Sequence, residues 1–372
     1  MGLLVPLDTM IHLITIEMME DPKVASLPIL DIRSPKEYAK GHIPGAISLP
    51  LFTDEERAVV GTTYHHEGRQ AAIIQGFDIT GPKWAGFIKT ALSHAPGQKV
   101  LLHCWRGGMR SEAMAWALNL YGFEVYVIKG GYKAFRRWTH RTFSQALELI
   151  VLSGKTGANK TGILQQLKHL GEQVVDLEAL ACHQGSAYGS MGRFIQPSQE
   201  QFENNLAWAL KVMESGRRIW IEDESRTIGK IAIPGPLWEQ LCVAPEIELM
   251  VPLESRVEVL NRQYGILNKD FLETATLKIK KRLGPDQTRA AIEDIQKGDM
   301  RSFIRRVLTY YDKAYAKSRK PVENKRWTAQ LAVGEPCDAL RVAARVLEMA
   351  QNEIAACSNN VDIKTNKDDN GN

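Results

Sequence analysis

Two glycine-containing turns, each between an apolar run and a helical segment, constrain the fold of this chain more than any other feature. The first turn begins at Cys104, after the apolar run 99–103 and before a helical segment over residues 111–121. The second covers residues 153–160, between the run 148–152 and a helical segment over 161–170. Gly122 and Gly171 end these two helical segments. An apolar strand, a turn and a helix in this order are typical of a parallel sheet with flanking helices, so we predict an α/β fold.

Further apolar runs support two such sheets in succession. Residues 28–31 and 124–128 belong to the first, and residues 173–176, 218–222 and 246–251 to the second, whereas the pattern from about residue 254 onward is helical. We place a first domain at 1–140 and a second at 141–355, since 372 residues suit two domains. The tail, 358–372, is rich in Asn, Asp and Lys and poor in apolar residues, so we expect it to be disordered.

The composition excludes several classes of protein. Hydrophobic residues make up 44% and charged residues 24%, as in an ordinary globular protein. No apolar run approaches the ~20 residues that span a bilayer, and the N-terminus lacks the features of a signal peptide, so we expect no membrane association. The five cysteines form no CxxC pair, which argues against structural zinc and for reduced thiols in the cytoplasm.

The turn at Cys104 has the features of a reactive thiolate. It reads Cys-Trp-Arg-Gly-Gly-Met-Arg-Ser over residues 104–111 and opens a helix. Backbone N–H groups at a helix N-terminus stabilise an anion, and Arg106 and Arg110 add positive charge. We therefore expect a lowered thiol pKa, a nucleophilic Cys104, and a loop that binds a tetrahedral oxyanion with Arg110 as a bidentate donor.

The second turn resembles a Walker A phosphate-binding loop, G-x-x-x-x-G-K-[ST], with Asn in place of the second glycine. Asn tolerates positive φ better than other non-glycine residues, so we expect the turn to form. Two acidic residues follow the predicted strand 218–222, where a Walker B carboxylate belongs, and the next two residues suit a phosphate or a ribose. The loop is compatible with Mg²⁺ without requiring it, and a diphosphate ester fits it as well as ATP does. The phosphate-binding candidates are Gly154, Thr156, Gly157, Asn159, Lys160, Thr161, Asp223, Glu224, Ser225 and Arg226.

Basic residues gather in one helical segment. Residues 271–326 hold 15 basic and seven acidic residues, a net charge of +8, so the rest of the chain is about −4. Tyrosines 310, 311 and 315 lie among them. A basic helical face with aromatic residues suits a nucleic-acid backbone and stacked bases, although a charge run by itself is more often a solvated surface. The candidate nucleic-acid-binding residues are Lys278, Lys280, Lys281, Arg282, Arg301, Arg305 and Arg306.

Residues ~8–138 resemble the rhodanese family. The resemblance rests on the Cys104 loop, on Asp-Ile-Arg-Ser-Pro over residues 31–35, and on Gly-His-Ile-Pro-Gly-Ala over residues 41–46. In that family the cysteine carries a transferred chalcogen, and the family's aspartate and arginine correspond here to Asp31 and Arg33, which we expect to brace the sheet and the loop. Five residues separate Cys104 from Arg110, whereas many rhodaneses have four. Five is also the spacing of cysteine-dependent phosphatases, which therefore stay a rival interpretation.

The whole of residues ~8–350 resembles the bacterial tRNA 2-selenouridine synthase family. Five segments carry this resemblance in order: the cysteine loop, Asp-Leu-Glu at 176–178, His-Gln-Gly-Ser at 183–186, Gln-Pro-Ser-Gln at 196–199 and Glu-Ser-Arg-Thr-Ile-Gly at 224–229. The resemblance implies a rhodanese-like sheet followed by a P-loop NTPase-like domain with a helical, basic C-terminal part.

The resemblance also implies a reaction. The family replaces the sulfur at C2 of a wobble 2-thiouridine with selenium from selenophosphate, and it S-geranylates that thiouridine with geranyl diphosphate. Cys104 would handle the selenium donor with Arg106 and Arg110, and the phosphate loop would bind the diphosphate. The basic helices would bind the tRNA anticodon arm. We expect no tightly bound cofactor and a monomer, with the selenophosphate-producing enzyme as a candidate partner.

Two other functions remain open at this point. One is a cysteine-dependent phosphatase with an ATP-regulated second domain, although no aspartate is convincingly placed as its general acid. The other is a non-catalytic persulfide carrier that binds RNA. Each uses the same cysteine, so the loop sequence alone does not separate them.

Overall fold

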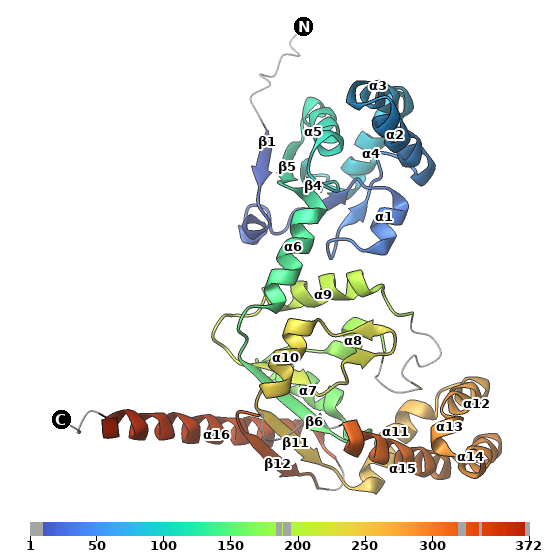
Figure 1. Ribbon diagram of the computed structural model, residues 1–372, viewed down its shortest axis with the longest axis vertical. Helices are drawn as coiled ribbons and strands as arrows, with labels where there is room; N and C mark the ends of the chain where they lie inside the picture. Colours follow the sequence, from blue (N-terminus) through green and yellow to red (C-terminus); the bar gives the residue numbers. More distant parts are fainter. Residues whose placement is uncertain (1–9, 184–187, 189–194, 319–324, 335–336, 369–372) are drawn as a thin grey trace. The chain divides into compact units, whose positions relative to one another are not determined.

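The computed structural model describes residues 10–183, 188, 195–318, 325–334 and 337–368. The chain divides into two compact units. The first comprises Met1–Thr142 with Glu203–Trp208, and the second comprises Phe143–Phe202 with Ala209–Asn372. Both are α/β units with parallel sheets, as predicted (Figure 1).

A parallel sheet of five described strands forms the centre of the first unit. Its spatial order is β1 (Ile11–Ile14), β5 (Glu124–Ile128), β4 (Lys99–His103), β2 (Ile29–Asp31) and β3 (Ile47–Ser48). The central strand β4 is buried on both faces, which explains its continuous apolar sequence. Leu102 belongs to the hydrophobic core on one face of the sheet and Leu101 to the core on the other.

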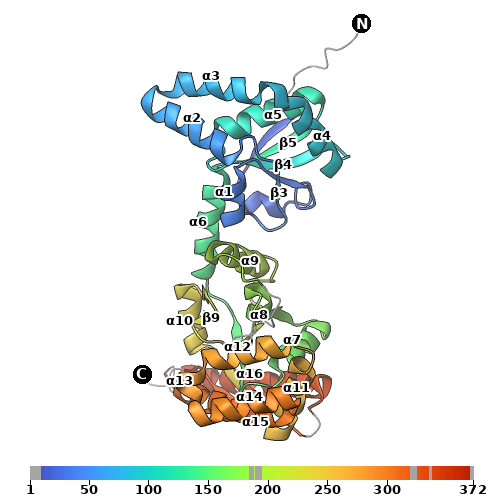
Figure 2. The same ribbon diagram turned by 90° about the vertical axis from the view of Figure 1, so that its right-hand side faces the viewer.

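Helices cover both faces of this sheet. They are η1 (Glu17–Glu20), α1 (Pro35–Lys40), α2 (Asp54–His66), α3 (Arg69–Thr80), η2 (Gly81–Lys83), α4 (Trp84–His94), α5 (Met109–Tyr121) and α6 (Gly131–Phe143). The helices α4 and α5 pack on the core that contains Leu102, and α6 packs on the core that contains Leu101. The helices α2 and α3 lie side by side (Figure 2).

The second unit also has a parallel sheet of five described strands. Its order is β12 (Thr328–Ala332), β11 (Glu246–Met250), β6 (Leu149–Gly154), β8 (Ile219–Glu222) and β7 (Gln173–Val175). A short antiparallel pair, β9 (Thr227–Ile228) and β10 (Ile231–Ala232), follows β8. The helices α7 (Lys160–His169) and α16 (Ala339–Asp368) share the core on one face of the sheet.

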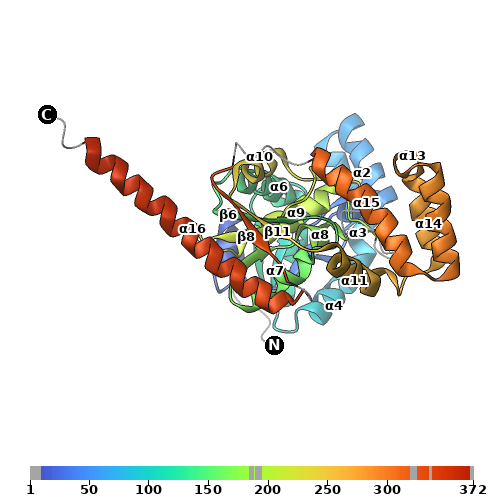
Figure 3. The ribbon, with the colours of Figure 1, turned by 90° about the horizontal axis from the view of Figure 1, so that it is seen from below.

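The remaining helices are α8 (Leu177–Ala181), α9 (Gln199–Lys211), α10 (Gly235–Val243), α11 (Leu253–Tyr264), α12 (Lys269–Lys278), α13 (Lys280–Leu283), α14 (Pro285–Lys297) and α15 (Met300–Ser318). The helices α11, α12, α14 and α15 bury a hydrophobic core of their own, and α11 lies beside α15 (Figure 3). Across the described residues, none of the helices is both long enough and apolar enough to cross a bilayer.

Two elements of the C-terminal part differ from the sequence prediction. The strand β12 interrupts the C-terminal part that we expected to be helical throughout. It is an edge strand of five residues whose outward side chains are mostly polar or small, so its apolar signal is weak. We expected disorder from residue 358, yet α16 continues to Asp368. Val342, Val346 and Ala350 anchor its first half in the core, and extending an existing helix costs less than starting one.

Candidate functional sites

Cys104 lies in the turn between β4 and α5, with only 3% of its surface exposed. The hydroxyl of Ser111 and the backbone N–H groups of Arg106 and Gly108 lie near its sulfur, and each lowers the pKa of the thiol. Burial raises the pKa of the Cys104 thiol, but the charge of Arg110 and these three donors outweigh burial and hold the pKa below its usual value. The turn therefore favours the thiolate.

Gly107 gives this turn its shape. It has a φ of +66°, and a Cβ atom there would lie 2.6 Å from the carbonyl oxygen of Ile128. The end of β5 therefore packs directly on the cysteine turn. The backbone N–H of Tyr132 also donates to the carbonyl oxygen of Cys104 at 2.9 Å. These close backbone contacts fix the turn in place.

Arg106 and Arg110 have different surroundings in the structure, although the sequence suggested the same role for both. Nη1 of Arg110 donates to Oε2 of Glu37 at 3.0 Å, and the pair is largely shielded from solvent. Glu37 also accepts the backbone N–H of Ser34 at 3.0 Å and so closes the N-terminus of α1. The side chain of Arg106 is exposed, and its backbone N–H is the group that reaches the sulfur. Arg110 is thus fixed beside Cys104, whereas Arg106 is not.

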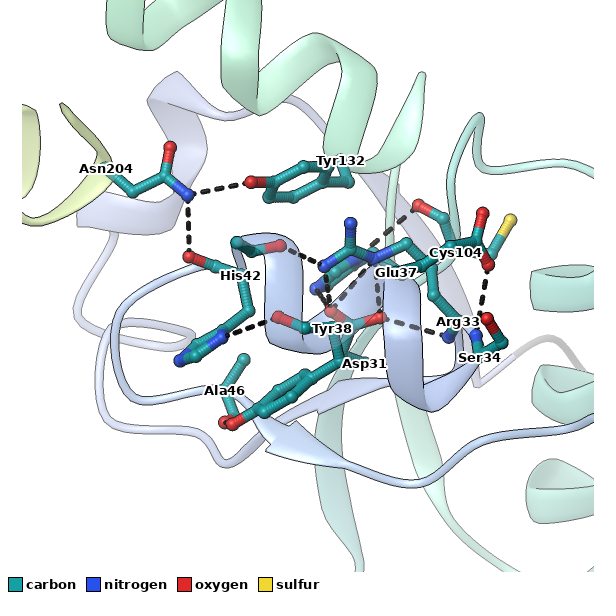
Figure 4. Close-up of polar contacts among 12 residues, drawn as sticks. Asp31, Arg33, Ser34, Glu37, Tyr38, His42, Ala46, Cys104, Tyr132 and Asn204 are labelled. Atoms are coloured by element: carbon teal, nitrogen blue, oxygen red, sulfur yellow. Dashed lines mark hydrogen bonds and ion pairs between the residues drawn. The ribbon is translucent and has the colours of Figure 1, made fainter. Parts of the chain in front are cut away.

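Asp31 and Arg33 form a fully buried pair beneath this region (Figure 4). Nη2 of Arg33 lies 2.5 Å from Oδ2 of Asp31 and donates to the carbonyl oxygen of Gly41 at 2.7 Å. The guanidinium lies 3.7 Å from the centre of the Tyr132 ring, and the amide of Asn204 donates to the Tyr132 hydroxyl at 2.8 Å. This network ties β2 to α6, which agrees with the structural role that the family resemblance gave to Asp31 and Arg33.

The phosphate loop joins β6 to α7 in the second unit. Asn159, which replaces the second Walker glycine, has φ +61° and ψ +31°, the left-handed conformation that the sequence predicted for it. Gly157 has φ +82°, and a Cβ atom there would lie 3.0 Å from the carbonyl oxygen of Arg256. The helix α11 therefore packs directly against the loop.

Lys160 lies among carboxylates. Its Nζ is 3.3 Å from the carbonyl oxygen of Gly154. Burial lowers the pKa of Lys160, but the negative charges of Glu224, Glu178, Glu222 and Asp223 outweigh burial and raise it. Lys160 is therefore held as a cation at the start of α7.

Three of these carboxylates converge. Glu178, Glu222 and Glu224 each present an oxygen within 4.8 Å of the others, and Thr161 Oγ1 donates to Glu178 at 3.2 Å. Burial, together with the charges of Glu178 and Asp223, raises the pKa of Glu224 to about 8 against the opposing effect of Lys160. Burial also raises the pKa of Glu222, whose Oε2 has no hydrogen-bond partner among the described residues.

A cavity of about 570 Å³ opens over the phosphate loop. Nine of the ten predicted phosphate-binding residues line it, from Gly154 to Thr161 on the loop and from Asp223 to Ser225 after β8. Arg226 is the exception, since it is exposed and outside the lining. The opposite wall comes from α10, α11 and α15.

A second cavity, of about 1130 Å³, lies among the basic helices. It brings together Arg282, Arg305 and Arg306 of the predicted nucleic-acid-binding residues, and adds Lys313 and Lys317. The remaining four, Lys278, Lys280, Lys281 and Arg301, lie outside its lining, and the three lysines are exposed.

Part of this basic charge is paired. Arg305 Nη2 lies 2.6 Å from Glu254 Oε2, and Arg306 Nε lies 2.6 Å from Asp294 Oδ2. Arg301 pairs with Glu258. Lys313 and Lys317 follow on α15 with their side chains exposed.

Sequence reasoning missed several groups of these sites. Glu37 was part of a recognised segment without a role, and its partner Arg110 is 73 residues away. Glu178 and Glu222 also lie in segments that stood out, but only the fold brings both to Lys160. The opposite wall of the phosphate cavity carries no sequence motif. Residues 184–186 of the His-Gln-Gly-Ser segment lie outside the described residues.

Comparisons with family models match most of the chain. The model described as "tRNA 2-selenouridine synthase AAA domain" matches residues 147–334. The model of the rhodanese-like domain matches residues 15–137. The two matches fall on the phosphate-loop unit and on the cysteine-loop unit, respectively.

Whole proteins named tRNA 2-selenouridine synthase are also similar to this chain. The one from Nitrosomonas europaea is 37% identical over 255 residues, which is 65% of this chain and 64% of the relative, just under two thirds of its length. Those from Sulfurovum sp. and Pseudomonas fluorescens (strain Pf-5) are each 36% identical. Their alignments cover 72% and 79% of this chain and 78% and 89% of the relatives.

Proposed function

Because this chain belongs to the tRNA 2-selenouridine synthase family, we propose that it is the enzyme that replaces the sulfur at C2 of a wobble 2-thiouridine with selenium. One observation carries the proposal: the same chain holds two different anion-binding sites. One is a thiolate turn, at Cys104, and the other is a phosphate loop, at Lys160, that faces a wall with no charged residue in its described lining. An exchange of sulfur for selenium through an S-alkylated intermediate needs one binding site for a diphosphate and one for a selenium donor.

In the first step, the phosphate loop binds the diphosphate of geranyl diphosphate. The sulfur of the thiouridine attacks C1 of the geranyl group, the C1–O bond breaks, and diphosphate leaves with the electron pair. The N3 proton of the nucleoside passes to solvent. Lys160 and the loop N–H groups stabilise the leaving diphosphate, as they would in other phosphate loops.

Mg²⁺ fits the acidic side of this binding site. The buried Oε2 of Glu222 has no hydrogen-bond partner among the described residues and is the kind of oxygen that a hard cation binds. Thr161, Glu178 and Glu224 would complete the donor set. When bound, the ion would neutralise charge on the diphosphate.

In the second step, the cysteine turn handles selenophosphate. A bare thiocarbonyl is a poor leaving group, whereas the S-geranyl group makes C2 electrophilic and leaves as geranyl thiol. Selenium then takes the place of sulfur, and water cleaves the selenium–phosphorus bond to release phosphate. We assign Cys104 the role of the nucleophile: its Sγ forms a bond to C2 as the geranyl thiol leaves, and the selenium of selenophosphate then displaces Cys104 as a thiolate, with Arg110 and the loop N–H groups as the anion donors.

The acceptor is the anticodon arm of a tRNA. The cavity that contains Arg282, Arg305, Arg306, Lys313 and Lys317 supports this assignment, because clustered cations bind a phosphate backbone. We propose a monomer in the cytoplasm that receives selenophosphate from the enzyme that makes it.

Mass spectrometry of tRNA nucleosides tests the proposal. The purified chain is incubated with tRNA that contains 2-thiouridine and with geranyl diphosphate, and selenophosphate is added afterwards. The Cys104→Ala and Lys160→Ala variants are treated in parallel. We expect a mass gain of one geranyl group, then its replacement by selenium.

The variants assign the two sites. Lys160→Ala should lose the first step, and Cys104→Ala should keep the first and lose the second. An unchanged nucleoside in every reaction would contradict the proposal, and the phosphatase and carrier alternatives would then be tested with an aryl phosphate and with RNA binding.

A further inference from the structure

We propose that Arg256 is a positioning residue of the phosphate loop: together with Asp312, it turns the peptide between Thr156 and Gly157 so that the N–H of Gly157 faces the bound diphosphate. The inference rests on the proposed function, because it concerns the loop to which that function assigns the diphosphate. It gives a role to two residues outside the loop that neither the sequence motifs nor the family resemblance singled out.

The guanidinium of Arg256 on α11 joins the phosphate loop to α15. Its Nη1 donates to the carbonyl oxygen of Thr156 at 3.3 Å and to Oδ1 of Asp312 at 2.8 Å, and its Nη2 donates to Oδ2 of Asp312 at 2.9 Å. A planar guanidinium that bonds both oxygens of a carboxylate cannot rotate without breaking one of these bonds. Asp312 therefore fixes the direction in which Arg256 reaches the loop.

The bond to Thr156 orients the next N–H group of the loop. A trans peptide unit is planar, and its C=O and N–H groups point in opposite directions. The carbonyl of Thr156 points to the guanidinium of Arg256, which lies outside the described lining of the phosphate cavity, whereas Gly157 lines that cavity. The N–H of Gly157 is thereby directed away from Arg256 and toward the cavity, where it can donate to an anion.

The main chain of Arg256 packs against the same peptide. Gly157 has a φ of +82°, and a Cβ atom there would lie 3.0 Å from the carbonyl oxygen and 3.2 Å from Cβ of Arg256. Only glycine fits this space and this conformation without strain. The first turn of α11 thus contacts the peptide at Gly157, while the guanidinium of the same residue holds the carbonyl of Thr156.

The burial of Arg256 is explained by the loop contact better than by stability. The residue is only 4% exposed, and its Nε has no hydrogen-bond partner among the described residues. A buried charge with an unbonded donor contributes little stability by itself. A pair that served only to join α11 to α15 could lie at the surface, as the pair of Glu258 and Arg301 does, with side chains 39% and 54% exposed.

A change at Asp312 separates positioning from simple charge. Nζ of Lys155 lies 3.8 Å from Oδ2 of Asp312, so this carboxylate faces two cations beside the loop. If only the charges mattered, removal of the negative charge would strengthen the binding of an anion. If Asp312 acts through Arg256, the same change frees the guanidinium to rotate, and the binding of an anion weakens.

Titration calorimetry of the full chain with inorganic pyrophosphate, at a fixed concentration of Mg²⁺, tests the inference. The principal variant is Asp312→Asn, which keeps the size of the side chain and removes its charge. The second is Arg256→Lys, since one ammonium cannot reproduce the bonds to Thr156 and to both oxygens of Asp312. The matched control is Glu258→Gln, which removes a carboxylate of α11 and its pair with Arg301 on α15 but leaves Arg256 and Asp312 in place.

We expect Asp312→Asn and Arg256→Lys each to raise the dissociation constant of pyrophosphate about tenfold, roughly the effect of one misdirected hydrogen bond to a charged group. Glu258→Gln should leave it within about twofold. Calorimetry also gives the number of binding sites per chain. A merely structural role would lower that number and leave the dissociation constant of the folded chains unchanged, whereas a positioning role raises the dissociation constant at an unchanged number of sites.

Unchanged or tighter binding of pyrophosphate by Asp312→Asn would overturn the inference, as would an equal weakening by Glu258→Gln. If Asp312→Asn instead lowers the number of sites, Arg256→Lys decides, and an unchanged dissociation constant in that variant overturns the inference.

The Lys160→Ala variant and the nucleoside assay separate this inference from the proposed function. If Lys160→Ala loses pyrophosphate while Asp312→Asn binds it normally, the inference fails and the phosphate loop of the proposed function is supported. If Asp312→Asn weakens pyrophosphate binding but the unmodified chain does not geranylate 2-thiouridine, the proposed function fails and the positioning role of Arg256 is supported.

Discussion

At the scale of single residues, the two arginines of the cysteine turn have the same side chain and different surroundings. Arg110 is held by Glu37 and makes the largest contribution that lowers the pKa of Cys104. Arg106 points its side chain to solvent and contributes through its backbone N–H, which any residue except proline would supply. Replacing the side chain of Arg110 should therefore change the pKa of Cys104, whereas replacing that of Arg106 should not.

We predict that Arg110→Met raises the pKa of Cys104 and that Arg106→Met leaves it unchanged. Without the Arg110 charge, burial disfavours the thiolate more strongly, so the thiol titrates at higher pH and alkylation at pH 7 slows several-fold. The measurement is the rate of alkylation of Cys104 by iodoacetamide between pH 5 and pH 10, with the site identified by mass spectrometry. Similar titration curves for both variants would contradict this assignment.

At the scale of elements, the cysteine turn is fixed by the close approach of β5 to Gly107. Any other residue at position 107 would have to adopt a φ of +66°, and its Cβ atom would lie 2.6 Å from the carbonyl oxygen of Ile128. Gly61 is a useful contrast in the same unit, because it lies within α2 and a Cβ atom there would meet nothing within 4 Å.

We predict opposite effects for the two Gly→Ala changes. Gly107→Ala should lower the free energy of unfolding by about 1–3 kcal/mol, through left-handed backbone strain and the steric contact. Gly61→Ala should raise it by up to about 1 kcal/mol, since alanine favours a helix interior. Urea unfolding monitored by circular dichroism gives both values. A neutral Gly107→Ala would show that the turn relaxes away from β5.

The difference between buried central strands and exposed edge strands explains how much of this fold could be predicted from the sequence. Central strands such as β4 are buried on both faces and stand out as apolar runs, and a glycine after a strand marks the turn that follows it. The edge strands β1, β3 and β12 are short or partly exposed and gave no comparable signal. The residues of the cysteine loop and the phosphate loop could be predicted, because each loop consists of consecutive residues. Glu37 at Arg110 and the wall of α10, α11 and α15 were not, because they depend on contacts between distant segments.

At the scale of the whole molecule, charge is divided unevenly along the chain. Residues 271–326 carry a net charge of +8 and the remainder about −4, which predicts that tRNA binds to the basic helices and not elsewhere. Several of these cations already have carboxylate partners: Arg305 pairs with Glu254, and Arg306 with Asp294. A paired arginine releases fewer counterions on binding than its formal charge suggests, so the exposed lysines of the basic cavity should dominate the salt dependence.

We predict that Lys313→Gln lowers the salt dependence of tRNA binding and that Lys297→Gln does not. Lys313 lines the basic cavity, whereas Lys297 is an exposed residue on α14 outside that lining, with Glu293 at 3.7 Å. Each phosphate contact contributes roughly 0.7–0.9 to the slope of log affinity against log salt, so Lys313→Gln should reduce the slope by about one. Filter binding of labelled tRNA from about 50 to 200 mM salt measures both slopes.

If the two lysine variants shared the slope of the unmodified chain, tRNA would have to bind outside this cavity. An equal reduction by Lys297→Gln would show that the charge of the segment acts as a diffuse field and that the cavity does not position the tRNA.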